Sequence, residues 1–182
     1  MATGQAERLM PMLEEVLAEG GATWRDLAGL GVGTGPGNFT GVRIAVAAAR
    51  GLALGLRVPA IGVTAFDALA CGRDAALVGR DARLGQVYLQ AFGPGAFGPV
   101  LQPLDAPLPE LPPGTPVLGD FSGEIAARMG GTPAEPLLPL AQATARLALS
   151  RLGGDNPRPA PLYLRAPDAA PPRDPPPVIL PG

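Results

Sequence analysis

A glycine-rich loop between an apolar run and a long apolar helix constrains this chain more than any other feature. The run from Leu30 to Gly33 indicates the end of a buried strand, and it leads into the segment GTGPGNFTG at 33–41. A helix is expected over 42–56, with Thr40 as its N-cap. A strand, a glycine-rich loop and a helix in this order can bind an anion on the backbone N–H groups of the helix N-terminus.

The spacing of this loop leaves two interpretations open. It matches neither the G-x-G-x-x-G pattern nor the Walker A motif, so a tight turn that needs glycine is the alternative to an anion site. Arg43 lies in the first helical turn, where the helix dipole disfavours a cation, and we expect an acidic partner, an anion or solvent around it. The candidate residues near an anion or nucleotide are Gly35, Gly37, Asn38, Thr40, Gly41 and Arg43.

Helices alternate with strands along the first 72 residues. We predict helices over 6–19, 42–56 and 65–71 and strands over 30–33 and 59–63, with Thr64 capping the third helix. This alternation predicts a parallel sheet with helices on its faces. Pro11 is expected in the first turn of its helix or at the start of a new one, because an interior proline costs about 3 kcal/mol.

The pattern changes after Gly72, where a hairpin opens a second unit. We predict strands over 75–79 and 86–92 with a turn at 81–85, a loop-rich stretch over 93–115, a strand over 116–118, helices over 122–129 and 140–152, and a short strand over 162–164. The segment 157–182 contains ten prolines and is otherwise expected to be extended or disordered. The predicted units are therefore 1–72, 73–152 and a proline-rich segment at 153–182.

The predicted helix over 42–56 is apolar nearly all round. Its polar residues Arg43 and Arg50 are seven positions apart and so lie on one face. Because a surface helix usually has a wide polar face, this helix is expected to bury two sides, one against its sheet and one elsewhere. Either its own domain covers both sides, or the second side is an interface with another chain.

Several classes of function are excluded by missing residue types. The chain has no histidine, one cysteine, and 14 basic residues that are all arginine. These absences exclude a Ser-His-Asp triad, a histidine or Cys-x-x-Cys metal site, a Walker A lysine and a Schiff base. The net charge of −2 argues against nucleic-acid binding by this chain alone. We find no signal peptide at Met1–Met10, and the apolar stretch 42–56, interrupted by Arg50, is too short to span a bilayer.

The glycine loop and its flanks carry a resemblance to a known family. The segment GPGNFTGVR at 35–43, preceded by AERLMP at 6–11 and followed by GLA at 51–53 and GVT at 62–64, closely resembles the TsaB (YeaZ) family. The segments DARLGQVY at 81–88 and LYLR at 162–165 are similar to the family's second-lobe hairpin and C-terminal strand. One departure is Asn38, where the family usually has serine.

The resemblance implies an α/β fold of the actin-like (ASKHA) type with two lobes. It also implies a non-catalytic cytoplasmic subunit that pairs with TsaD, is joined by TsaE, and activates formation of N6-threonylcarbamoyladenosine at position 37 of tRNAs reading codons that start with A. The implied pairing surface is a helix bundle that includes Leu9, Met12, Leu13, Val16, Val42, Ala45, Ala49 and Leu52. No metal, membrane or cofactor is expected for this subunit alone, ATP or ADP is placed at the complex interface, contact with tRNA is indirect, and a homodimer is the alternative when TsaD is absent.

Two further expectations follow from comparison with the family pattern. Family members begin with additional strands, so the first lobe is expected to be truncated here, with those strands encoded in frame immediately upstream of Met1. The alternative function is an independent nucleotide phosphotransferase or ATPase of the same fold, which would need an acid such as Asp81 or Asp120 to hold magnesium. Turn and capping roles are the competing interpretation of both aspartates.

Overall fold

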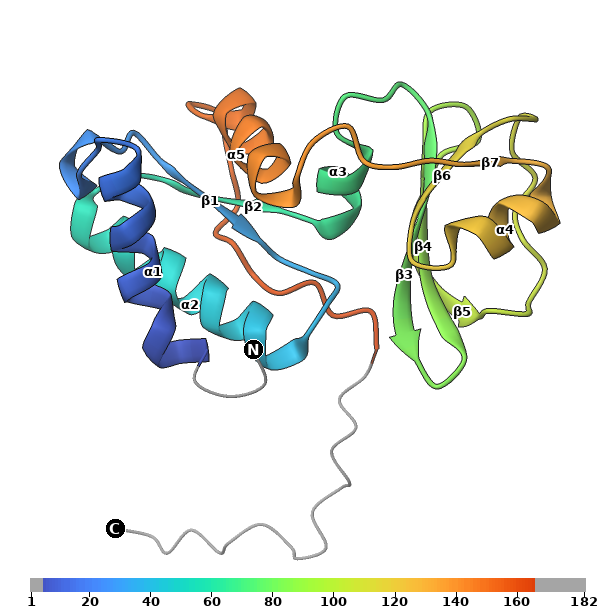
Figure 1. Cartoon of the computed structure of the whole chain (residues 1–182), viewed down its shortest axis with the longest axis horizontal. Helices are drawn as coiled ribbons and strands as arrows, with labels where there is room; N and C mark the ends of the chain where they lie inside the picture. Colours follow the sequence, from blue (N-terminus) through green and yellow to red (C-terminus); the bar gives the residue numbers. More distant parts are fainter. Residues whose placement is uncertain (1–4, 166–182) are drawn as a thin grey trace, which may run out of the picture.

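The structure is a computed structural model that describes residues 5–165, and its chain forms two lobes (Figure 1). In the first lobe, strands β1 (Leu30–Gly33) and β2 (Ala60–Val63) pair in parallel, with Leu30 opposite Ala60 and Gly33 opposite Val63. Four α-helices and a short 3-10 helix belong to this lobe, and α2 and α5 pack directly on the strand pair. They are α1 (Gln5–Glu19), η1 (Trp24–Asp26), α2 (Phe39–Leu56), α3 (Ala65–Ala70) and α5 (Leu140–Arg151).

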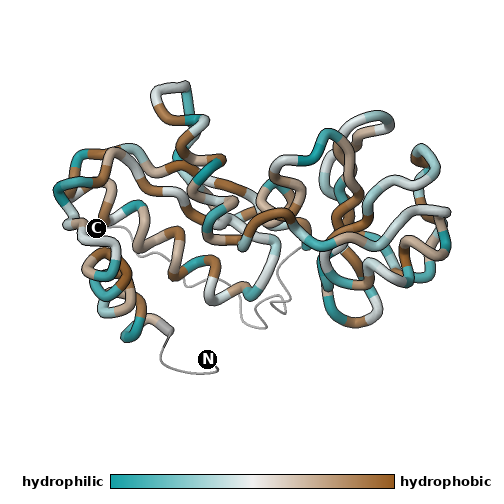
Figure 2. Tube along the Cα trace, turned by 45° about the horizontal axis from the view of Figure 1, so that its top comes forward, coloured by the Kyte–Doolittle hydropathy of each residue, from teal (hydrophilic) through white to brown (hydrophobic). Residues whose placement is uncertain are grey.

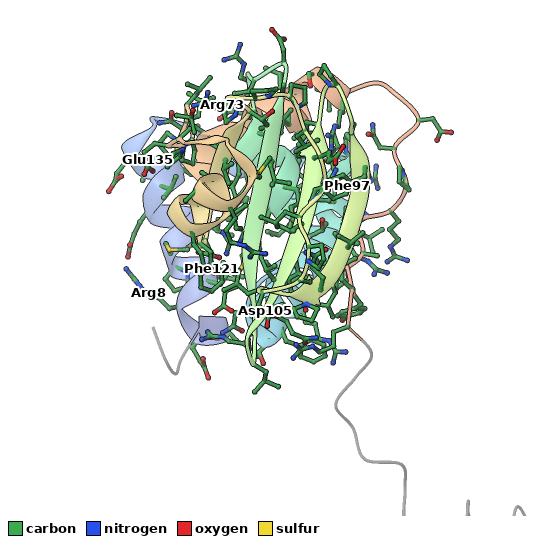
Figure 3. All side chains as sticks on the ribbon, turned by 90° about the vertical axis from the view of Figure 1, so that its right-hand side faces the viewer. Arg8, Arg73, Phe97, Asp105, Phe121 and Glu135 are labelled. Carbon is green, nitrogen blue, oxygen red and sulfur yellow. The ribbon has the colours of Figure 1, made fainter. Side chains whose placement is uncertain are left out.

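The second lobe is a mixed five-stranded sheet with one helix beside it. Its strands run in the order β5-β4-β3-β6-β7, and β3 pairs antiparallel with β4 and parallel with β6. The elements are β3 (Ala76–Arg83), β4 (Gln86–Phe92), β5 (Phe97–Pro103), β6 (Pro116–Gly119), α4 (Ser122–Met129) and β7 (Thr132–Pro133). Figure 3 shows these strands from the second-lobe side, with α4 next to the sheet and Phe121 where the helix begins.

Three hydrophobic clusters form the interior. The first packs the β3–β4–β6 face against α4, and its members include Leu77, Leu89 and Ile125, all with no exposed surface. The second holds α5 against the β1–β2 pair, and the third joins α3 to β3 and β6 between the lobes. A further link between the lobes is the hydrogen bond of 2.8 Å from Arg73 Nη2 to the Glu135 carbonyl (Figure 3).

Most predicted elements are present at nearly the predicted bounds. The parallel pair in the first lobe, the hairpin after Gly72 and the helices near 6–19, 122–129 and 140–152 are all confirmed. Thr64 caps α3 as predicted, because its hydroxyl accepts a hydrogen bond of 3.0 Å from the Asp67 N–H. The α/β fold class therefore agrees with the periodicity of the sequence.

Two predictions about prolines were wrong. Pro11 lies inside α1, which continues through it, and the Glu7 carbonyl that loses its helical donor is on the exposed side of the helix, where water can bond it. The loop predicted over 93–115 contains β5, although Pro99 and Pro103 fall within it. β5 pairs only with β4, and an edge strand tolerates proline because one side needs no donors.

Two predictions near the C-terminus also need correction. Residues 162–164 are not a strand, because Pro157, Pro159 and Pro161 remove alternate N–H groups just before them, and only the Leu162 N–H bonds to the Thr34 carbonyl, at 2.8 Å. Helix α5, which the sequence placed in the second unit, packs on β1 and β2 instead. The division of the remaining chain into units stays a prediction.

Candidate functional site

The glycine loop is a turn whose backbone is largely used by the protein itself. Thr34, Gly35 and Pro36 are buried, and the peptide bond between Gly35 and Pro36 is cis. Gly35 has φ +90°, a conformation that favours glycine, and its carbonyl accepts a hydrogen bond of 2.7 Å from the Ala65 N–H at the start of α3. These contacts support the tight-turn interpretation of this part of the loop.

Helix α2 begins earlier than the sequence predicted. Asn38, not Thr40, is the N-cap, and its Oδ1 accepts a hydrogen bond of 2.9 Å from the Gly41 N–H. Asparagine is among the best N-cap residues, and α2 therefore begins at Phe39, directly after Asn38. Gly37, Asn38 and Thr40 are exposed, whereas Gly41 is half-buried. The predicted anion-proximal residues therefore lie together at the N-terminus of α2. One of the backbone N–H groups that an anion could use, that of Gly41, already donates to the Asn38 side chain.

Arg43 has aromatic partners rather than an acidic one. Its Cζ atom lies 3.8 Å from the centre of the Phe39 ring and 5.4 Å from that of Tyr163, and its Nε donates a hydrogen bond of 2.7 Å to the Tyr163 hydroxyl. The two rings are 5.5 Å apart. Among the described residues no carboxylate forms an ion pair with Arg43. Attraction to the ring faces offsets the unfavourable position of a cation at a helix N-terminus.

Helix α2 buries only one narrow side in this chain. Val46 and Ala53 are its buried residues, and they lie over the β1–β2 pair. Another side, about a quarter turn round the helix from these two residues, carries exposed residues at helical spacing, namely Arg43, Ala47, Gly51 and Leu54, which we call the outer stripe. Leu54 is 80% exposed. The prediction that α2 buries two sides is therefore only half fulfilled within this chain.

The predicted interface residues are mostly half-buried. On α2 these are Val42, Ala45, Ala49 and Leu52, which flank the buried side rather than the outer stripe. On α1, which lies beside α2 in Figure 1, Leu9 and Leu13 are half-buried, while Met12 is 37% and Val16 is 59% exposed. The sequence analysis missed Leu54, although its position eleven residues after Arg43 on a helix could have identified it. Whether these residues meet a partner stays a prediction.

The two candidate magnesium ligands have structural roles. The Asp120 carboxylate accepts a hydrogen bond of 2.9 Å from the Asp81 N–H and lies 3.3 Å from Arg80 Nε. The Asp81 carboxylate accepts one of 2.7 Å from the Arg83 N–H where β3 approaches its turn. Over residues 5–165, no group of three or more His, Cys, Asp or Glu side chains is arranged to hold a metal ion. The turn and capping interpretation of both aspartates is favoured.

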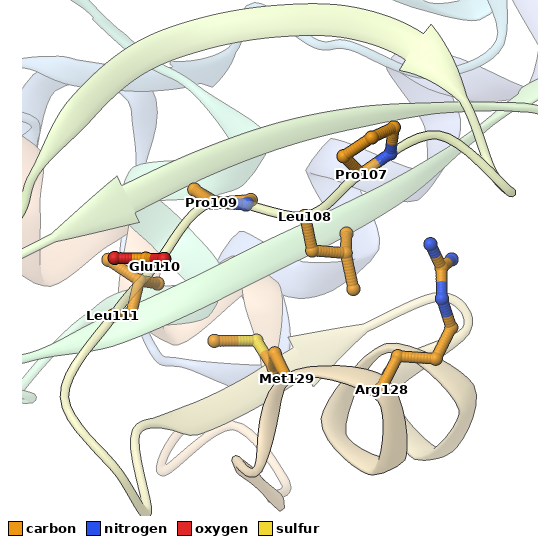
Figure 4. Close-up of a pocket in the computed structure, with 7 residues that line it drawn as sticks. All are labelled: Pro107, Leu108, Pro109, Glu110, Leu111, Arg128 and Met129. Atoms are coloured by element: carbon orange, nitrogen blue, oxygen red, sulfur yellow. The ribbon is translucent and has the colours of Figure 1, made fainter.

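A surface pocket of about 580 Å³ lies in the second lobe, away from the glycine loop (Figure 4). It is lined by residues 107–111 and by Arg128 and Met129 of α4. The Arg128 guanidinium donates to the carbonyls of Leu104, Asp105 and Ala106, with distances of 3.2 and 2.6 Å to the latter two. Arg128 thus holds the loop after β5, and the pocket presents one further charged group, Glu110.

By length and composition, α2 could cross a membrane. The sequence analysis excluded a span because 42–56 is too short, whereas the helix extends over 18 residues from Phe39 to Leu56. One such helix is weak evidence, because core helices of globular proteins have the same composition. Its packing against β1 and β2 instead supports a helix of a globular lobe that leaves one face open.

Comparisons with known proteins relate most of the chain to one group. Residues 2–100 match the family model of TsaD, tRNA N6-adenosine threonylcarbamoyltransferase. Over 88 residues the chain is 41% identical to the tRNA threonylcarbamoyladenosine biosynthesis protein TsaB of Escherichia coli (strain K12). The aligned region covers 45% of this chain and 38% of that protein. An uncharacterized protein of Mycobacterium tuberculosis (strain ATCC 25618 / H37Rv) is 35% identical over 175 residues, covering 93% of this chain and 79% of that protein.

Solved structures extend the likeness to both lobes. YeaZ from Pseudomonas aeruginosa matches with a TM-score of 0.69 and 25% identity, covering 88% of this chain and 86% of that one. A protein described as similar to peptidase YeaZ from Pseudomonas aeruginosa gives a TM-score of 0.67 and 28% identity, covering 88% and 84%. The actin-like α/β fold that the family resemblance implied is thereby confirmed.

Proposed function

Because the chain belongs to the TsaB (YeaZ) family, we propose that it is the partner and activator subunit of a TsaD-containing complex. In this proposal the complex forms N6-threonylcarbamoyladenosine at position 37 of tRNAs that read codons starting with A. The activity of the Escherichia coli relative in tRNA threonylcarbamoyladenosine biosynthesis supports this pathway, although the matched region spans 38% of that protein. The chain contributes a docking surface and no catalytic residue of its own.

The observation that carries the pairing role is the open apolar surface of α1 and α2. Of the 18 residues of α2 only two are buried, and from Ala6 to Glu19 no residue of α1 is buried. Apolar helix surface left in water is unfavourable by about 25 cal/mol for each Å². A second helical surface that covers α1 and α2 removes this cost, and a partner subunit of the same fold offers such a surface.

The remaining partners follow from this assignment. TsaE joins the pair, ATP or ADP sits at the complex interface near the N-terminus of α2, and tRNA is contacted only through the complex. In the absence of TsaD the same surface supports a homodimer. We place the complex in the cytoplasm, where tRNA is modified, and the lone cysteine is consistent with a reducing compartment.

An independent phosphotransferase or ATPase is not favoured. Its acid would be Asp81 or Asp120, and both carboxylates already accept backbone hydrogen bonds. A peptidase activity lacks support as well, since the sequence contains no histidine or lysine to serve as a general base. ATP turnover by the purified chain alone would contradict the proposed role.

The test is direct binding to TsaD from the same genome. We expect the unaltered chain to elute with TsaD from a sizing column and to raise the rate of threonylcarbamoyl transfer to tRNA. Ala49→Arg, which adds a bulky cation beside the buried side of α2, should abolish both effects while the second-lobe amides stay protected from hydrogen exchange.

The matched control is Ala127→Arg on α4, an equally large change at an exposed helical position of the other lobe. It should leave pairing unchanged. Ala47→Arg on the outer stripe distinguishes the two faces of α2, because it disrupts pairing only if the partner covers that stripe. Complex formation that survives both Ala49→Arg and Ala47→Arg would contradict an interface on α2.

A further inference from the structure

The C-terminal segment 157–165 connects the lobes and reaches the start of α2. After α5 it runs beneath the β1–β2 pair towards the second lobe, as the orange-red trace in Figure 1 shows. Pro159 is buried, and the Leu162 N–H donates to the Thr34 carbonyl at 2.8 Å, next to the glycine loop. Arg165 at its end donates a hydrogen bond to the Gln86 side chain at the start of β4. The segment therefore contacts both sheets.

Alternate residues of this segment have different surroundings. Leu162 and Leu164 pack against the cluster between the lobes, whose members include Phe66 of α3 and Leu118 of β6. Tyr163, between them, is half exposed, and its ring lies beside Phe39. Because the two neighbouring leucines fix the backbone on either side, the Tyr163 hydroxyl is held at a defined place above the first turn of α2.

That hydroxyl determines where the Arg43 side chain lies. An arginine side chain has many rotamers, and restricting it to one of them costs conformational entropy. Here Nε bonds to the Tyr163 hydroxyl at 2.7 Å while the guanidinium plane lies over Phe39 at 3.8 Å. Two directional contacts therefore hold Arg43, which lies on the outer stripe of α2, in one rotamer before any partner arrives.

We propose that Tyr163 is a positioning residue for partner binding, which rests on the proposed function above. In this inference the partner subunit covers the outer stripe of α2, and Tyr163 holds Arg43 in the orientation that the partner meets. It does so from a segment that also contacts the cluster between the lobes. The position of the C-terminal segment between the lobes is thereby coupled to the affinity of α2 for its partner. Tyr163 acts through Arg43 and takes no part in the chemistry of transfer.

The experiment is a double-mutant cycle on binding to TsaD. Tyr163→Phe keeps the ring and removes the hydroxyl, and Arg43→Gln removes the cation. We expect Tyr163→Phe to weaken binding about fivefold, the equivalent of one hydrogen bond. If Tyr163 acts through Arg43, the double variant should bind no more weakly than Arg43→Gln alone.

Two matched controls separate this effect from general damage. Tyr88→Phe removes the other tyrosine hydroxyl in the chain, and Arg146→Gln removes an exposed cation from α5. Both should bind within about twofold of the unaltered chain. The Arg43 Nε–H proton, observed by NMR in the free chain, should exchange slowly with water and become fast in Tyr163→Phe.

The outcomes distinguish the two proposals. If the unaltered chain fails to bind TsaD, the proposed function is overturned, and this inference with it. If the unaltered chain binds and Tyr163→Phe binds equally well, the function stands and the positioning role is overturned. An equal loss from Tyr163→Phe in the presence and absence of Arg43 would also overturn it, because the tyrosine would then act independently of the arginine.

Discussion

The two lobes bury their apolar residues to very different extents. In the second lobe Leu77, Leu89, Val117 and Ile125 have no exposed surface, and they form a continuous interior with α4. In the first lobe α2 is also largely apolar (Figure 2), yet only Val46 and Ala53 of its 18 residues are buried. The interior of the second lobe is therefore packed within this chain, whereas the first lobe leaves an apolar helix surface exposed.

The largest expected effect is the loss of unfolding free energy when a buried leucine is truncated, and truncation of an exposed valine provides the comparison. Leu89→Ala should lower the free energy of unfolding by about 2–5 kcal/mol, because it opens a cavity in the second lobe. Val16→Ala on α1, at a site 59% exposed, should change stability by less than about 0.5 kcal/mol. Urea denaturation followed by circular dichroism measures both. Equal losses would show that α1 is already buried in the free protein.

A partner should stabilise the first lobe more than the second. Trp24 in η1 is the only tryptophan of the chain, so its fluorescence reports the first lobe. With TsaD present at 100 times its dissociation constant, the unfolding free energy seen by Trp24 should rise by about 2.7 kcal/mol. Hydrogen exchange of the second-lobe amides provides the internal reference. A uniform rise across both lobes would argue that they unfold as one unit.

A smaller loss is expected from the residue that fixes α5 to the first lobe. Arg151 donates to the Gly62 carbonyl at 3.0 Å and to the Asp67 carboxylate at 3.1 Å. Because the pair is partly exposed, Arg151→Ala should cost about 1 kcal/mol, detected as a lower midpoint of the Trp24 transition. Arg146→Ala, an exposed position on the same helix, is the control. A second-lobe probe should not shift.

The smallest effect concerns the exposed cap of η1. Hydrogen bonds from the Thr23 hydroxyl and N–H, at 2.7 and 2.8 Å, lower the pKa of Asp26 below its ordinary value of 3.8. The hydrogen-bonded Asp26 carboxylate therefore stabilises the folded state above pH 3.8, and this contribution is lost as the pH falls through the lowered pKa. An acid titration of the Thr23 amide by NMR measures this, and Asp26→Asn should remove the transition. A midpoint above 3.8 would contradict the cap.

The sequence predicted the elements whose signal is local. The apolar periodicity of α1, α2 and α4 and the alternation in β4 each lie within one segment, so their bounds were predicted to within a few residues. β5 was missed because Pro99 and the flanking glycines argue against a strand, and its stability comes from pairing with β4. The side of α5 that is buried could not be inferred, because its partner strands lie far upstream.

The site could be predicted only in part for the same reason. The glycine loop and the unusual position of Arg43 are visible in nine consecutive residues. The Tyr163 hydroxyl that satisfies Arg43 lies 120 positions away, and no local pattern connects the two. The choice of Asn38 over Thr40 as N-cap depends on the path of the loop through the buried Gly35 and Pro36, which the residue types alone do not fix.

The return of α5 to the first lobe sets an order of events during synthesis. The second lobe is one contiguous stretch and can fold once β7 has left the ribosome. Gly31 of β1 faces Ala148 of α5, so the sheet of the first lobe waits for a helix made more than a hundred residues later. Closing so long a loop is slow. The lobe that is translated first is therefore the last to fold, and its apolar helix stays accessible to chaperones or to a waiting partner in the meantime.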